Sequence, residues 1–194
     1  MVLFCRPDTG MSSEMCTQFR YIHEDSGSDC SIYPAGYLSS NGCGFNPFPK
    51  GYHARPMDDP GFPFPSWWYS DKCFVDLKRE LELRMNKEYR GGFSIAVLSP
   101  GRGGVNGAFD YGNSILVNGE SLVANKVVAS PVELLQRLIS SARADSDSRD
   151  VLKTARSLQK LNKLASLEEV ARTPLSIVSL LLGLGEGVLA PFLI

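Results

Sequence analysis

The chain has five cysteines and two histidines that could supply a nucleophile or bind a metal. They are Cys5, Cys16, Cys30, Cys43, Cys73, His23 and His53. A thiol-dependent enzyme would need a cysteine activated by a histidine, as a Cys43–His53 or a His53–Cys73 pair would allow. Their sequence neighbours do not indicate activation, and no Gly-x-Ser-x-Gly motif offers a serine instead. We therefore expect no catalytic residue, with a thiol-dependent enzyme as one alternative.

The spacing of the cysteines does not favour a zinc site. No Cys-x₂-Cys pair is present, so each ligand would have to come from a separate loop. We expect reduced thiols, no metal and no other cofactor. The first ten residues, MVLFCRPDTG, lack the apolar stretch of a secretory signal, which predicts an intracellular protein.

Cations recur every three or four residues in the segment 149–165, which we predict to be a helix. They are Arg149, Lys153, Arg156, Lys160 and Lys163. That spacing places them on one helical face, broadly opposite the apolar residues Val151, Ala155, Leu158 and Ala165. Such a face can bind RNA phosphates or an anionic membrane, or it can simply be solvated. If this face and the side chains of Arg90 and Arg102 bound phosphates, the chain would be an RNA-binding accessory protein, such as a viral factor.

Residues 174–194 read PLSIVSLLLGLGEGVLAPFLI, with Glu186 as the single charge. The length is close to that needed to cross a bilayer core, but three glycines weaken a continuous helix. A segment this apolar must be covered by the protein's own core, by a partner or by a membrane. The sequence leaves these three possibilities open.

Residues 44–69 combine repeated prolines with many aromatic side chains. Proline excludes a long helix or a central strand, yet so much aromatic surface is not left in water. We expect the segment to pack either on the rest of this chain or on a partner. The predicted partner-binding residues are Phe45, Phe48, Tyr52, Phe62, Phe64, Trp67 and Trp68.

The chain divides by composition into residues 1–70 and residues 71–194. The first part has eight of the twelve prolines and thirteen of the nineteen aromatic residues, and it contains all the cysteines except Cys73. The second part has regular patterns: a helix over 71–89, a strand over 93–98, and a helix over 132–144 that begins at a Ser130-Pro-Val-Glu133 capping box. Residues 114–117 and 120–128 read as a hairpin around Asn118-Gly119.

These patterns predict the α+β class. We expect an irregular proline- and aromatic-rich N-terminal arm, then a helix, a three-stranded antiparallel sheet and a C-terminal helical cluster that ends in the apolar segment.

The function that these features favour is a non-catalytic structural or interaction protein in a larger assembly, such as a virion, a membrane complex or an organellar complex. It would dock through the arm and the apolar segment, with a protein partner or a second copy. A formal net charge of −1 argues against a protein built wholly around a polyanion. Membrane contact through residues 174–194 and nucleic-acid binding stay open, and the protein would lie inside the cell, at a membrane or within a virion.

Overall fold

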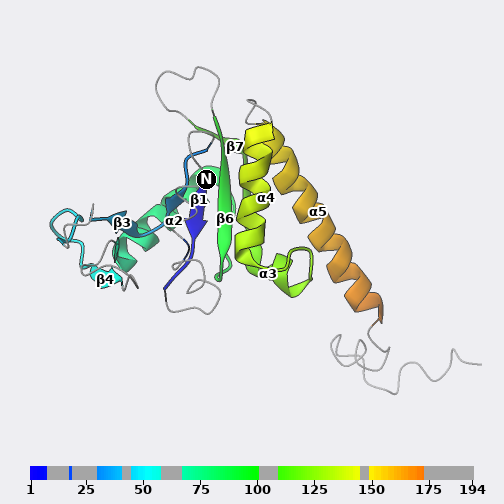
Figure 1. Cartoon of the computed structure of the whole chain (residues 1–194), viewed down its shortest axis with the longest axis horizontal. Coiled ribbons are helices and arrows are strands. Elements are labelled where there is room, and N and C mark those ends of the chain that lie inside the picture. Colours follow the sequence, from blue (N-terminus) through cyan, green and yellow to red (C-terminus); the bar gives the residue numbers. More distant parts are fainter. Residues whose placement is uncertain are drawn as a thin grey trace, which may run out of the picture.

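The computed structural model describes residues 1–7, 18, 30–40, 45–57, 67–100, 109–144 and 149–172, with the backbone alone at 100, 149 and 168–172. The predicted α+β class is confirmed, because the described residues form helices together with two separate sheets (Figure 1). The division of the chain at residue 70 stays a prediction.

The larger sheet has the strand order β2-β1-β6-β7. Its strands are β1 (Val2–Phe4), β2 (Tyr33–Pro34), β6 (Ser94–Pro100) and β7 (Phe109–Asn118). β1 runs parallel to β2 and antiparallel to β6, and β6 pairs antiparallel with β7. The first residues of the chain therefore lie inside the sheet, whereas the sequence analysis assigned them to the irregular arm.

Helices cover both faces of this sheet. Figure 1 shows α2 (Asp71–Met85) on one side and α4 (Pro131–Ala144) with α5 (Arg149–Arg172) on the other. On the α2 side, the ring of Phe4 packs edge-on against Phe74 with the centroids 5.9 Å apart. Because side chains alternate along a strand, Leu3 takes the opposite face, in register with Ile95. Both are completely buried.

A second sheet, which the sequence analysis did not predict, forms within the proline-rich region. Its order is β3-β5-β4, with β3 (Tyr37–Ser39), β5 (Trp67–Tyr69) and β4 (Arg55–Met57) all antiparallel. Three-residue strands are too short to show an alternating pattern, and proline is tolerated in β4 because β4 lies at the edge. β5 leads directly into α2.

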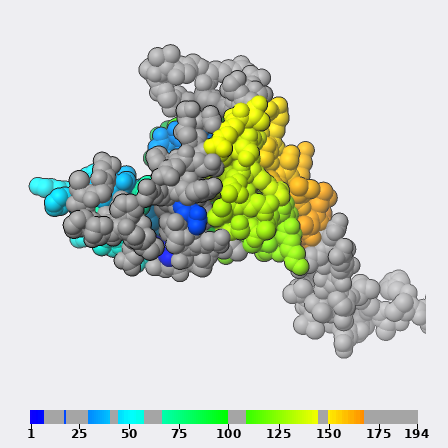
Figure 2. Space-filling view, viewed as in Figure 1, coloured from blue at the N-terminus to red at the C-terminus, as the bar shows by residue number. Residues whose placement is uncertain are grey.

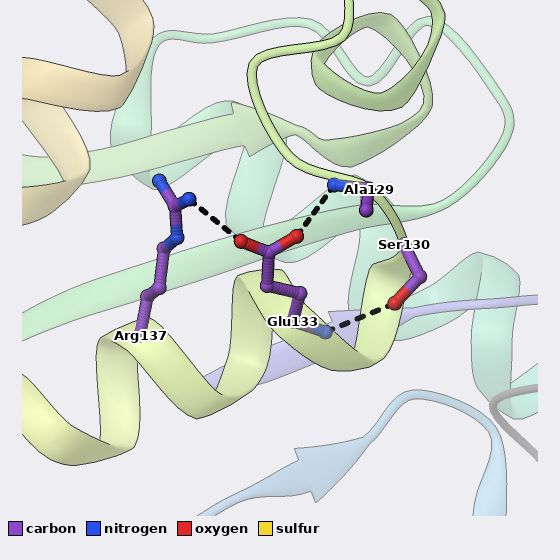
Figure 3. A network of polar contacts seen from close by, with 4 residues as sticks. All are labelled: Ala129, Ser130, Glu133 and Arg137. Carbon is purple, nitrogen blue, oxygen red and sulfur yellow. Dashed lines mark hydrogen bonds and ion pairs between the residues drawn. The ribbon is translucent and has the colours of Figure 1, made fainter.

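The predicted helices are confirmed in position, but α2 and α5 end at other residues than predicted. α2 ends at Met85 rather than at residue 89, because Asn86 adopts a left-handed conformation (φ 50°) and closes the helix. α4 begins at the predicted capping box, in which Ser130 Oγ accepts a hydrogen bond from the Glu133 amide at 3.2 Å (Figure 3). α5 continues without a break to Arg172.

The hairpin predicted around Asn118-Gly119 is wrong. Asn118 ends β7, and its side chain accepts a hydrogen bond from the Ser121 amide at 2.8 Å, so that it caps the short helix α3 (Gly119–Ala124). Asparagine followed by glycine suits a hairpin turn, but asparagine is also a favoured N-cap residue. The strand expected over 120–128 is therefore replaced by α3 and a turn.

Candidate interaction surfaces and a polar cavity

α5 presents the predicted cations on its outer face. Lys153, Arg156, Lys160 and Lys163 are exposed, and the side chain of Arg149 lies outside the described residues. The opposite face packs into the core through Val151, Leu152, Ala155 and Leu158. The two faces expected from the spacing are therefore both present.

The cations on α5 differ in their partners. Lys153 forms an ion pair with Asp150, one turn earlier in the helix. Within the described residues, no carboxylate pairs with Arg156, Lys160 or Lys163. The positive charge on this side is reinforced by Lys87, whose pKa is lowered mainly by burial and further by the positive charge of Arg156.

Three leucines on the C-terminal half of α5 are exposed to solvent. Leu161, Leu164 and Leu167 are 50%, 58% and 65% exposed. This end of α5 points away from the rest of the fold (Figure 1). Leu164 and Leu167 follow Lys160 at helical spacing and so share its face. The sequence analysis missed them, although a row of leucines at three-residue spacing outside the buried stripe was a readable signal.

A groove of about 640 Å³ lies between α4 and α5 and is lined by side chains of both helices. Leu158 and Leu161 supply its apolar lining, and Arg137, Lys153 and Thr154 are among the polar residues around them. The exposed leucine row therefore begins inside this groove.

The structure separates the predicted partner-binding aromatic residues. Phe45 is 79% exposed, whereas Phe48 and Tyr52 are half-buried against each other with ring centroids 6.1 Å apart. Trp67 packs against the protein's own core, and Trp68 lies on the opposite face of the second sheet. Phe62 and Phe64 lie outside the described residues.

The outer face of the second sheet is apolar. Leu38, Trp68 and Pro56 stand side by side across β3, β5 and β4, and Leu38 is 40% exposed. Figure 2 shows residues 45–57 at the left margin of the molecule, well separated from α4 and α5. The aromatic residues and the α5 face therefore form two distant surfaces.

A polar cavity of about 380 Å³ lies where α5, β7, α3 and the connection after α2 meet. Its lining residues are Glu88, Arg90, Ser94, Leu116, Asn118, Ser121, Gln159, Asn162 and Lys163. Only Leu116 among them is apolar. Of the predicted residues, Lys163 and Arg90 line this cavity, and the sequence analysis missed the others.

Side-chain amides and hydroxyls hold the wall of the cavity in place. Asn162 accepts a hydrogen bond from Asn125 Nδ2 at 2.7 Å and donates to Ser121 Oγ at 3.0 Å. Asn125 also donates to Ser166 Oγ at 2.9 Å, and Gln159 Nε2 donates to the Leu116 carbonyl at 2.7 Å. Gln159, Asn162 and Ser166 recur at helical spacing along the inner side of α5, which was the signal available in the sequence.

Two of the described thiols, Cys5 and Cys73, do not have the setting of a nucleophile. Cys5 is fully buried. Burial, and secondarily Asp76, raises the pKa of Cys73, so this thiol is protonated at neutral pH. Cys16, Cys43, His23 and Arg102 lie outside the described residues. In the described part of the chain, no group of three or more His, Cys, Asp and Glu side chains could hold a metal ion.

The helices of the described ranges include none with the length and hydropathy needed to span a bilayer. Residues 174–194 lie outside those ranges. In the comparisons with known proteins, no family model, no curated protein and no solved structure matches this chain.

Proposed function

We propose that the protein is a non-catalytic interaction subunit that works inside the cell as part of a larger assembly. The observation that carries this proposal is the row of exposed leucines on α5, which begins in the groove beside α4. In the sequence, the apolar residues 174–194 follow this row. Exposed apolar surface of this kind marks a docking site, because leaving it in water is unfavourable. The apolar outer face of the second sheet supplies a second contact.

The leucine row suits a protein surface. Its side chains alternate with cations, so the apolar contact would be surrounded by charged groups, as at many protein interfaces. A groove between two helices can accept an amphipathic helix from a partner or from a second copy of the chain.

Sedimentation velocity on the purified full chain tests this proposal. We expect species larger than the 21.3 kDa monomer, and a shift toward the monomer in the triple variant Leu161→Gln, Leu164→Gln, Leu167→Gln. The matched control is Leu83→Gln, because Leu83 is 83% exposed on α2, away from the groove. A stable, detergent-free monomer from the unmodified chain would contradict the proposal.

A second candidate function is RNA binding along α5. It is favoured by the exposed Arg156, Lys160 and Lys163, which lack carboxylate partners among the described residues. Binding should weaken steeply with salt, because phosphate contacts release counterions. Replacing all three cations by glutamate should abolish retention of a labelled RNA in a filter-binding assay, whereas Lys153→Glu should have a smaller effect because Asp150 already pairs with Lys153. Binding that does not respond to salt would exclude this function.

A further inference from the structure

The polar cavity between α5, β7 and α3 contains features that docking through the leucine row does not use. Its volume of about 380 Å³ falls in the range of small-molecule sites. Eight of the nine lining residues have polar side chains, and polar and apolar atoms share the lining surface about equally. A ligand that carries several hydrogen-bonding groups on a small carbon frame would match this lining.

Two amides of the lining are oriented by the protein and keep a free group. The Oδ1 atom of Asn118 accepts the Ser121 amide, which leaves its Nδ2 as a donor. Gln159 uses Nε2 to donate to the Leu116 carbonyl, which leaves its Oε1 as an acceptor. A hydroxyl group both donates and accepts, so it matches a donor and an acceptor fixed in this way.

The charges of the lining favour an anion. Arg90 and Lys163 are positive and have no carboxylate partner within the described residues, whereas Glu88 is the single negative group of the lining. Lys87 precedes Glu88 and donates to the Ser114 carbonyl at 2.6 Å, and its positive neighbour is Arg156. A guanidinium and an ammonium together suit a phosphate group, and the Glu88 carboxylate can accept hydrogen bonds from hydroxyls.

We propose that this cavity binds a small phosphomonoester with several hydroxyl groups, such as a pentose phosphate. Arg90 and Lys163 hold the phosphate, and Gln159, Asn118 and Glu88 bind the hydroxyls. This inference is independent of the assembly role, because it uses neither the leucine row nor the second sheet.

Calorimetric titration of the full chain at constant ionic strength tests the proposal with three probes: ribose 5-phosphate, ribose and inorganic phosphate. We expect ribose 5-phosphate to bind at least about tenfold more tightly than either of the others, since each charge-assisted contact contributes roughly a factor of ten. Failure to bind at 10 mM, or equal binding of inorganic phosphate, would overturn the proposal.

Variants locate the site. The double variant Arg90→Ala, Lys163→Ala should lose at least about tenfold in affinity for ribose 5-phosphate. Gln159→Leu should weaken ribose 5-phosphate but leave inorganic phosphate unchanged, a selectivity that partial unfolding would not produce. Arg79→Ala is the matched control, because Arg79 is exposed on α2 and does not line the cavity.

A nucleic-acid end has the same phosphate chemistry. A 5′-phosphorylated RNA hexamer that bound more tightly than ribose 5-phosphate and than the same hexamer without its 5′-phosphate, and lost that advantage in the double variant Arg90→Ala, Lys163→Ala, would assign the cavity to a nucleic-acid end and overturn the proposal.

Discussion

At the residue scale, Glu133 links the start of α4 to the chain before it. Its carboxylate accepts a hydrogen bond from the Ala129 amide at 2.5 Å and pairs with Arg137 at 2.6 Å (Figure 3). The hydrogen bond from the Ala129 amide is the main cause of a lowered pKa of Glu133. The contacts with Arg137 lower this pKa further. The ionised carboxylate is therefore the form that the folded state prefers.

This preference predicts a pH-dependent stability. Because the pKa of Glu133 is lower in the folded state, its contribution is complete above the ordinary value of 4.5 and is lost as the pH falls through the folded-state pKa. Urea unfolding between pH 3 and pH 7 should therefore show the unmodified chain more stable than Glu133→Gln near neutrality, with the difference closing below about pH 4.5. A difference that stays constant over this range would contradict the argument.

Gly36 permits a close approach between the turn before β3 and the residues around the start of α2. Its φ is +82°, and an added Cβ would lie 2.8 Å from the Tyr69 ring and 2.9 Å from Phe74 Cβ. Gly36→Ala should destabilise the fold by about 2–4 kcal/mol, which combines backbone strain with overpacking. Gly51→Ala separates the two effects, because Gly51 has φ +94° but no atom within 4 Å. In thermal melts, Gly36→Ala should therefore lower the Tm more than Gly51→Ala does. The additional loss measures the cost of overpacking.

At the element scale, β7 is an edge strand, and side chains cover two of its carbonyls. Lys87 donates to the Ser114 carbonyl and Gln159 donates to the Leu116 carbonyl, at 2.6 Å and 2.7 Å. An uncovered edge strand can pair with another molecule. The two side chains therefore occupy the positions where a foreign strand would bind.

Removing this cover should promote association. The double variant Lys87→Ala, Gln159→Ala should lose about 1–3 kcal/mol of stability and show concentration-dependent association beyond that of the unmodified chain, measured by light scattering. Lys72→Ala is a suitable control, since its ion pair with Asp76 lies within α2. Unchanged scattering in the double variant would show that the edge is protected by other groups.

Sequence patterns predicted the elements that depend on local signals. α4 was predictable because Ser130, Pro131 and Glu133 all act within one helical turn. Asn118-Gly119 was ambiguous, because the same pair suits a hairpin and a helix start. The pairing of β3, β5 and β4 depends on contacts between distant short segments, which no local pattern encodes.

The candidate site was predictable only in part for the same reason. The spacing of cations predicted the exposed face of α5, but the cavity combines Arg90, Asn118 and Gln159 from separate elements. In the sequence, the polar residues on the inner side of α5 were the one local pattern that indicated this cavity. Without the fold, Gln159 and Asn162 are ordinary helical residues.

At the scale of the whole molecule, β1 is the strand on which the larger sheet depends. It lies between β2 and β6, and Leu3 is completely buried. Leu3→Ala should destabilise the fold by about 2–5 kcal/mol, because it leaves a cavity between the sheet and its helices. Leu83→Ala, on an exposed leucine, should change the urea midpoint little. Similar effects of the two variants would argue against a central β1.

The central place of β1 also orders events during synthesis. Leu3 pairs with Ile95, about ninety residues later, so the ribosome must add those residues before β1 meets this partner. Until then, the apolar Val-Leu-Phe segment is exposed to chaperones and to other nascent chains. Closing so long a loop before the sheet can form makes folding slow relative to a protein with local contacts.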